Sequence, residues 1–300
     1  MTTDYWPPVC ALGTLDDEPH CAATALAALE NGDIDPEGLH TALVQSKVVR
    51  LAVRRLAGRQ LGPAGTKLLD LLLATDTEER ARHAAAEAVT LPVLRLAAAT
   101  DAAVIKGLAL RSCYPDPAAR HLGDIDVHTP DLATGLAFTT ALRGQGWAWD
   151  LVEFPWLKWD EDGICYGQLP VVYPDSAAMI TRVDLHFGAF SVGHAGRLPM
   201  VGWQRADVLG VDVRVPNRET AIALVAAHAL GDTRLSMKDV NDLCVLIGDG
   251  VVDWSSVTEL ARTAHATDVL GQLLAEVGSA YPGRWCPTLR TGHRLRSGGL

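Results

Sequence analysis

The feature that most constrains the fold is a change in residue pattern near residue 100 and again near residue 217. Apolar residues recur at helical spacing from His20 to Ala99, and nothing there alternates as a strand does. Between 101 and 216, short β-branched runs are separated by turn residues, and helical spacing then returns. The sequence therefore predicts an α+β protein with a small mixed β-sheet flanked by N-terminal and C-terminal helical bundles.

The same changes of pattern divide the chain into four expected parts. We expect a helical region at 1–100 whose first 19 residues fray, an α/β core at 101–216, a helical region at 217–282 and a loose tail at 283–300. Strands are expected in the core at 101–107, 121–130, 147–154, 164–173, 179–190 and 211–216. After the core, 255–282 has the pattern of one long helix.

Charge and composition exclude some classes of partner. The 300 residues carry a net charge of −10, which argues against bulk DNA, because nucleic acid binding needs a basic surface. The most basic stretch, Lys47 to Arg59, is interpreted as the solvated face of an amphipathic helix, with tRNA binding as the alternative. Scattered cysteines, no signal peptide and no apolar run of transmembrane length favour a cytoplasmic protein without a membrane partner.

Two carboxylates stand one residue apart in the apolar segment "HLGDIDVHTP". Side chains alternate across a strand, so Asp124 and Asp126 are expected on one face and Ile125 on the other. Adjacent carboxylates repel each other, so a positive group or a cation is expected beside them.

A third acid supplies a reason for this arrangement. Asp184 lies in another predicted strand, and if the two strands are neighbours, three carboxylates converge. Hard oxygen ligands of this kind suit Mg²⁺ or Mn²⁺, which also bridge to substrate phosphates. By alternation His186 shares a face with Asp184, where it is expected to orient a carboxylate or a metal-bound water, or else to be a core histidine.

The segment upstream of the acid pair has features of a phosphate site. A strand is expected to end at Lys106-Gly107, where a helix begins and a glycine would let a phosphate approach the backbone N–H groups. Lys106 and Arg120 could supply charge to a triphosphate.

This set of motifs resembles the nucleotidyltransferase superfamily of the DNA polymerase β type. That superfamily has a strand, a Gly turn, an acid–x–acid pair and a third acid on a later strand. A closer similarity is to an uncharacterised bacterial nucleotidyltransferase family with "KG…YPDP…R…GDID" and a later "DLH". The matching residues, within about 100–190, are Lys106, Gly107, Tyr114 to Pro117, Arg120, Gly123 to Asp126, and Asp184 to His186.

The resemblance implies transfer of a nucleoside monophosphate from an NTP to a small-molecule, peptide or protein acceptor, with release of pyrophosphate. It implies that Asp124 and Asp126 hold the metals and the triphosphate, and that Asp184 holds the catalytic metal and helps to deprotonate the acceptor. Lys106, Gly107, Arg120 and Gly123 would bind the nucleotide.

At one position the sequence differs from the superfamily pattern, and this difference favours another class of function. Leu108 follows Gly107 where the superfamily usually has Gly-Ser or Gly-Gly, so a serine hydroxyl for phosphate is missing. The alternative is therefore a catalytically inactive binding or scaffold protein, and a further one is a toxin-like transferase that acts on tRNA.

Several other polar and aromatic residues have plainer interpretations. Asp116 and Asp175 adjoin prolines and are interpreted as turn formers. A predicted helix carries three charged residues that are interpreted as a solvated face rather than as part of an acceptor site, namely Lys238, Asp239 and Asp242. Four tryptophans near the third predicted strand are interpreted as core rather than as an acceptor pocket, namely Trp147, Trp149, Trp156 and Trp159.

Overall fold

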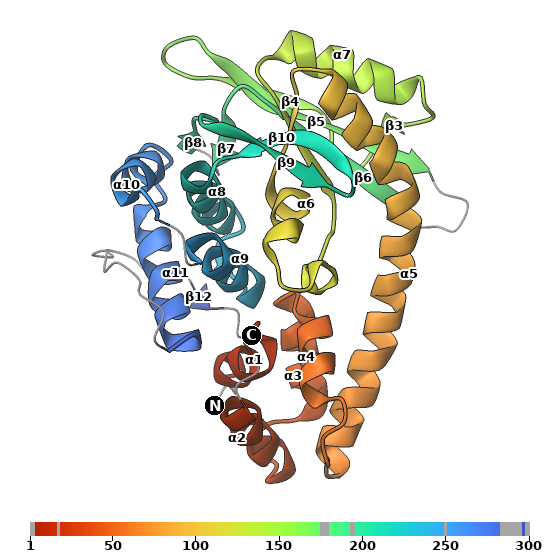
Figure 1. Cartoon of the computed structure of the whole chain (residues 1–300), viewed down its shortest axis with the longest axis vertical. Helices are drawn as coiled ribbons and strands as arrows, with labels where there is room; N and C mark the ends of the chain where they lie inside the picture. Colours follow the sequence, from red (N-terminus) through yellow and green to blue (C-terminus); the bar gives the residue numbers. More distant parts are fainter. Residues whose placement is uncertain are drawn as a thin grey trace.

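A long helix joins a group of N-terminal helices to a β-sheet in the computed structural model (Figure 1), which describes residues 4–16, 19–174, 180–192, 196–248, 251–282 and 296–297. This helix is α5 (Pro63–Ala99), and it continues through Pro92 as one element. The shorter helices before it are α1 (Trp6–Gly13), α2 (Pro19–Glu30), α3 (Pro36–Gln45) and α4 (Val49–Leu56). Asp35 caps α3 by accepting a hydrogen bond from the Gly38 amide, as its place before Pro36 predicts.

The sheet is mixed, as predicted, and it has eight strands in the order β3-β5-β6-β2-β1-β10-β9, with β4 paired to β5. Two neighbouring pairs, β2 with β6 and β1 with β10, are parallel, and the other pairs are antiparallel. The strands are β1 (Ala103–Val104), β2 (Ile125–Thr129), β3 (Ala148–Trp149), β4 (Trp156–Trp159), β5 (Cys165–Pro174), β6 (Ile180–Phe187), β9 (Trp203–Val208) and β10 (Val211–Pro216).

Short elements and one helix connect these strands. A separate hairpin is formed by β7 (Phe190–Val192) and β8 (Gly196–Leu198). The connecting helices are α6 (Lys106–Leu110), the 3₁₀ turns η1 (Arg111–Cys113) and η2 (Pro117–Ala119), and α7 (Leu132–Arg143). α7 covers one face of the sheet at close range, because a Cβ on Gly135 would lie 2.9 Å from Leu185 Cδ2.

The C-terminal helices pack on the N-terminal ones rather than standing apart from them (Figure 1). One apolar cluster contains residues of both groups, such as Leu43 and Leu56 with Leu243 and Leu270, and a second cluster lies between the sheet, α7 and the end of α5. The C-terminal elements are α8 (Arg218–Gly231), β11 (Arg234–Leu235), α9 (Met237–Ile247), α10 (Trp254–Thr263), α11 (Thr267–Ala280) and β12 (Arg296–Ser297).

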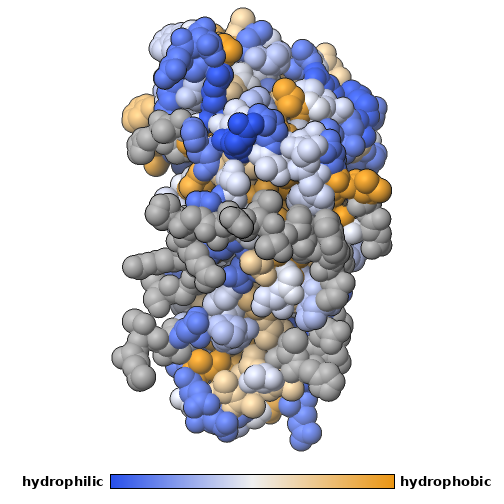
Figure 2. All heavy atoms as spheres, turned by 90° about the vertical axis from the view of Figure 1, so that its left-hand side faces the viewer, coloured by the Kyte–Doolittle hydropathy of each residue, from blue (hydrophilic) through white to orange (hydrophobic). Residues whose placement is uncertain are grey.

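The surface agrees with the ordinary hydropathy of the sequence. The face that carries α10 and α11 mixes hydrophilic residues with separate hydrophobic ones (Figure 2). Among the described residues, no helix combines the length and apolarity that crossing a bilayer requires.

Three expectations for the helical regions are wrong. Residues 6–13 form α1 rather than a frayed end, because Val9 and Leu12 are fully buried and Trp6 Nε1 donates to Glu276 Oε2 at 2.9 Å. The segment 255–282 is two helices, because His265 adopts a φ of 56° between them. The basic stretch is not a wholly solvated face, because Arg55 is 4% exposed, although Arg54 of the same helix is exposed.

Further differences concern the tail and the strands, of which β8 and β9 were not predicted. The strand predicted at 147–154 contains only Ala148–Trp149 as β3, and the neighbouring strand β4 begins at Trp156. The tail prediction falls on 283–300, where only Arg296–Ser297 belongs to the described residues and pairs with β11.

Candidate active site

The three predicted acids meet because β2 and β6 are parallel neighbours. Asp126 pairs in register with Asp184, and Ile125 pairs with Val183, so the two acids share a face by alternation. Asp124 was expected inside a strand but directly precedes β2. The opposite face, which carries Leu185, packs against α7, so the acids lie on the face turned away from that helix.

Each acid offers an oxygen to a common point. One carboxylate oxygen from each of Asp124, Asp126 and Asp184 lies within 4.8 Å of the other two. Asp126 and Asp184 are 2% and 7% exposed. Oδ1 of Asp184 is buried without a hydrogen-bond partner among the described residues, which is costly for a carboxylate unless a ligand binds there.

The mutual repulsion of these acids appears in their protonation. Burial, together with Asp126 and Asp124, raises the pKa of Asp184 to about 7. The charge of Asp126, followed by burial, raises the pKa of Asp124. Burial opposes ionisation of Asp126 as well, yet Lys106 and His186 hold its pKa well below the usual value. The metal-free site therefore binds a proton at Asp184 more readily than an exposed aspartate does.

Lys106 is a positive group of the kind that the sequence predicts beside the two neighbouring acids. Its Nζ lies 2.6 Å from Asp126 Oδ1 and 5.1 Å from the centre of the Phe190 ring. Burial opposes the charge of Lys106, but Asp126 and Asp124 outweigh it and raise the lysine pKa. Nε2 of His186 approaches the same Oδ1 atom at 3.2 Å, so the expected orienting contact with a carboxylate is present.

The donor set fits a divalent cation. Three carboxylates, one of them with a buried unpartnered oxygen, provide the hard oxygen ligands that Mg²⁺ and Mn²⁺ prefer. The chemistry of the ligands indicates a divalent metal without selecting between these two ions.

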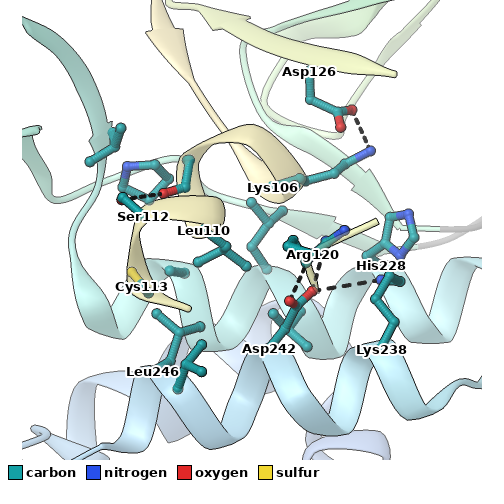
Figure 3. A pocket seen from close by; sticks show the side chains of 18 of the residues that line it. Lys106, Leu110, Ser112, Cys113, Arg120, Asp126, His228, Lys238, Asp242 and Leu246 are labelled. Atoms are coloured by element: carbon teal, nitrogen blue, oxygen red, sulfur yellow. Dashed lines mark hydrogen bonds and ion pairs between the residues drawn. The ribbon is translucent and has the colours of Figure 1, made fainter. Parts of the chain in front are cut away.

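A cavity of about 210 Å³ opens beside the acids, and we call it the lysine cavity (Figure 3). Lys106, Gly107, Arg120 and Gly123 line it, together with Asp124 and Asp126. At Gly107 a Cβ would lie 3.4 Å from the Arg120 guanidinium nitrogens, so glycine keeps this turn close to that side chain. The four residues expected to bind nucleotide are therefore brought together, while binding itself stays a prediction.

Arg120 has a second partner that its sequence position did not indicate. Its Nε and Nη2 donate to Asp242 Oδ1 and Oδ2 at 2.7 and 2.8 Å, and Tyr114 Oη donates to Oδ1 at 2.6 Å. In Figure 3, Lys238 also extends from α9 toward Asp242, with Nζ at 3.7 Å from Oδ2. The solvated-face interpretation of Lys238, Asp239 and Asp242 is wrong, because all three are at most 7% exposed.

Two cations in the lysine cavity were missed by the sequence reasoning. Lys47 and Arg218 line the cavity, and neither forms an ion pair within the described part of the chain. Burial, together with Lys238, lowers the pKa of Lys47. Lys47 has a left-handed φ of 59°, as Lys106 does with 51°, and strained backbone of this kind is concentrated at functional sites. Only membership of a basic stretch hinted at Lys47.

The plainer interpretations have mixed outcomes. Asp116 is a turn former, because its side chain accepts a hydrogen bond from the Ala118 amide, whereas Asp175 lies outside the described residues. Trp147 is core at 4% exposed, but Trp159 is 64% exposed, so the core interpretation is wrong for that residue.

Comparison with known proteins gives a family match and a distant structural similarity. A structure titled as an antigenic nucleotidyltransferase-like protein from Paracoccidioides brasiliensis matches with 13% identity and a TM-score of 0.31, over 61% of this chain and 81% of that chain. No curated protein matches the sequence. The model of a family described as uncharacterised nucleotidyltransferase matches residues 32–279. By that match over most of its length, the chain belongs to the uncharacterised nucleotidyltransferase family.

Proposed function

We propose that this protein catalyses metal-dependent transfer of a nucleoside monophosphate from an NTP to a small-molecule, peptide or protein acceptor, with release of pyrophosphate, in the manner of polymerase β-like nucleotidyltransferases. One observation supports this proposal more strongly than any other. Three carboxylates, two in parallel strands and one directly before β2, converge beside a cavity lined with cations. Phosphoryl transfer needs acidic side chains that hold metal ions and cationic side chains that bind the phosphates.

The carboxylates have separate roles in this proposal. Asp124 and Asp126 hold the metal that carries the triphosphate, and Asp184 holds the metal nearer the acceptor. A bound Mg²⁺ or Mn²⁺ supplies charge stabilisation to the phosphoryl group and to the departing pyrophosphate. Asp184 also helps to accept the proton of the attacking hydroxyl or amine, as a carboxylate placed beside the acceptor can.

The lysine cavity is lined by both charged and apolar side chains. Lys47, Lys106 and Arg218 lie among its lining residues and are suited to a triphosphate. α8 and α9 add apolar side chains, among them Leu224 and Leu246, which are suited to the face of a base. The Gly107-Leu108 sequence lacks a serine hydroxyl, and these cations replace that contribution in the proposal.

Metal-dependent nucleotide binding is the first test. We expect wild type to bind Mn²⁺–ATP or another Mn²⁺–NTP in calorimetry, and Asp124→Asn to lose this binding while it keeps the metal-free melting temperature. The fold is expected to survive because Asp124 and Asp126 repel each other in the metal-free state. A wild type that binds no NTP with Mg²⁺ or Mn²⁺ supports the inactive scaffold instead.

Lys47→Gly tests the phosphate role of a cation without harming the backbone. Glycine adopts a φ of 59° freely, so the metal-free stability should be equal or higher. Loss of a charged hydrogen bond should weaken NTP binding by about 1.5–3 kcal/mol. An unchanged dissociation constant would remove Lys47 from the nucleotide site.

A further inference from the structure

We propose that His83, on α5, is a positioning residue that holds the loop 121–124 and thereby places Asp124 for metal binding. Its ring contacts the backbone of Leu122, which lies 39 residues further along the chain. The inference rests on the proposed nucleotidyl transfer and adds to it a residue, outside the acids and the lysine cavity, that controls the metal affinity of the site.

Asp124 depends on support from other elements more than the other two acids do. Asp126 and Asp184 belong to β2 and β6, and the pairing of these strands fixes the backbone at both positions. Asp124 precedes β2 and follows Gly123. Apart from its chain neighbours, the nearest described atom to a Cβ added at Gly123 is His121 Nε2, at 4.0 Å. Glycine leaves the backbone more freedom than any other residue, so the position of Asp124 is set by contacts of the loop before it.

His83 makes such a contact with the backbone of the loop. Its Nε2 lies 3.2 Å from the carbonyl oxygen of Leu122 and 3.4 Å from the amide nitrogen of the same residue. In one neutral tautomer Nε2 donates to the carbonyl, and in the other it accepts from the amide. Either form therefore ties α5 to Leu122, two residues before Asp124.

A second contact holds the loop against the same face of α5. Glu79 precedes His83 by about one helical turn, so both side chains lie on one side of the helix. Oε1 of Glu79 is 3.5 Å from His121 Nδ1, and the rings of His121 and His83 are in edge contact with their centres 5.9 Å apart. Two successive residues of the loop, His121 and Leu122, are thus held by one continuous helix.

Packing around the loop is a poor substitute for the contact with His83. A cavity of about 300 Å³ lies between α5 and the loop, and residues 121–124 also line the lysine cavity. Groups beside a cavity have fewer packing contacts, so each hydrogen bond there has more influence on their position. Without His83, the anchors that remain are the ion pair of Arg120 with Asp242 before the loop and strand β2 after it.

The test compares the same substitution at two histidines that contact other elements. His40, on α3, is half-buried like His83, lies 2.9 Å from Thr75 Oγ1 of α5 and lines neither cavity. His40→Leu therefore removes a comparable hydrogen bond without touching the loop. His83→Leu removes the bond to Leu122, whereas His83→Gln places an amide group near the position of Nε2 and can keep it.

Three quantities are measured for each variant. They are the affinity for Mn²⁺ by calorimetry, alone and with ATP, the deuterium uptake of 121–126 without metal, and the free energy of unfolding in urea. We expect His83→Leu to weaken Mn²⁺ binding by tenfold or more, which is the usual effect of losing a group that orients a metal ligand. Its uptake in 121–126 should rise. His83→Gln and His40→Leu should both stay within threefold of wild type in Mn²⁺ affinity.

Each other outcome counts against the inference. A loss of less than tenfold in His83→Leu overturns it and leaves the proposed function standing. If His40→Leu weakens Mn²⁺ binding equally, His83 acts only through general stability, and if His83→Gln is as weak as His83→Leu, the bond to Leu122 does not place Asp124. Should His83→Leu fail to fold, His83→Asn, whose amide is too short to reach Leu122, is judged by the same measurements. A wild type that binds Mn²⁺ neither alone nor with ATP overturns the proposed function and this inference with it.

Discussion

Asp126 has two basic partners, Lys106 and His186, whereas Asp184 has none among the described residues. Lys106 and His186 both contact Asp126 Oδ1, so their favourable charge interaction is concentrated on that one acid. Asp184 is left with a buried oxygen that no described residue satisfies. The metal-free protein therefore carries a local cost at Asp184, and a bound cation would remove it.

This cost should depend on pH. The pKa of Asp184 rises from 3.8 to about 7 on folding, so the folded state binds its proton more tightly than the unfolded state. Stability from this group is then complete below pH 3.8 and is lost as the pH rises through about 7. We expect metal-free Asp184→Asn to be more stable than wild type by about 1–3 kcal/mol at pH 8, with the difference shrinking toward pH 4.5.

Urea unfolding with EDTA at several pH values measures this difference. Asp212→Asn is the control, because Asp212 is an exposed carboxylate far from the site in sequence and in the sheet. Saturating Mn²⁺ should reverse the order, since wild type gains stability from a metal that the variant binds less well. A variant that is less stable than wild type at pH 8 without metal would show that Asp184 has a structural partner.

At the scale of elements, helix α9 is joined to the loop before β2 by a buried ion pair. Arg120 on the loop and Asp242 on α9 are 6% and 2% exposed in their side chains, and both oxygens of Asp242 accept from the guanidinium. This contact holds the segment that ends at Gly123 and Asp124 against the C-terminal helices. The loop that carries a metal-ligand candidate is therefore positioned from outside the sheet.

Breaking this pair should be costly, whereas replacing both partners should not. Asp242→Asn leaves a buried guanidinium without its counter-ion, and we expect a loss of about 3–5 kcal/mol in unfolding free energy. The double variant Arg120→Met with Asp242→Leu should recover much of that loss. Denaturant unfolding measures both, and Asp212→Asn, which breaks the exposed pair with Arg205, should change stability by less than about 1 kcal/mol. If Asp242→Asn and Asp212→Asn lowered the free energy of unfolding equally, burial of the Arg120–Asp242 pair would not add to the cost of breaking it.

Much of the element pattern was accessible from the sequence for a local physical reason. Capping residues such as Asp35 and Asn217, and the glycine at 107, act on their immediate neighbours, so their effect is visible in a short segment. The acid pair and Asp184 were found because alternation fixes the face of each side chain. The break at His265 was missed because histidine at a positive φ has no local signal comparable to glycine.

At the scale of the whole molecule, the lysine cavity is assembled from three distant parts of the chain. Lys47 comes from the turn after α3, Lys106 from the start of α6 and Lys238 from α9. No pattern within a single segment can predict this convergence, because it depends on how the two helical regions pack around a shared apolar core. For the same reason Lys238 and Asp242 were misinterpreted as solvated, since their burial is set by neighbours far away in sequence.

Nucleotide binding should therefore protect three separate segments at once. We expect Mn²⁺–ATP to lower deuterium uptake in 45–50, 104–126 and 236–246, because ligand contacts stabilise the states in which all three are closed. Hydrogen exchange followed by mass spectrometry measures each segment. α7, on the opposite face of the sheet, is the internal control and should be unchanged. Protection confined to 104–126 would show that the flanking helices take no part in the site.

The parallel pairing of β2 with β6 also determines how this protein can change over evolution. Between Thr129 and Ile180 the chain forms α7 and three further strands of the same sheet, and the last of these, β5, pairs with β6 on the side away from β2. The loops that connect these elements can change in length without moving Asp126 relative to Asp184, because they lie outside the paired strands. Within β6 itself, a single inserted residue before Asp184 would turn this acid toward Gly135 and α7. Length variation is thus tolerated in these connecting loops and forbidden in the few residues of β6 before Asp184.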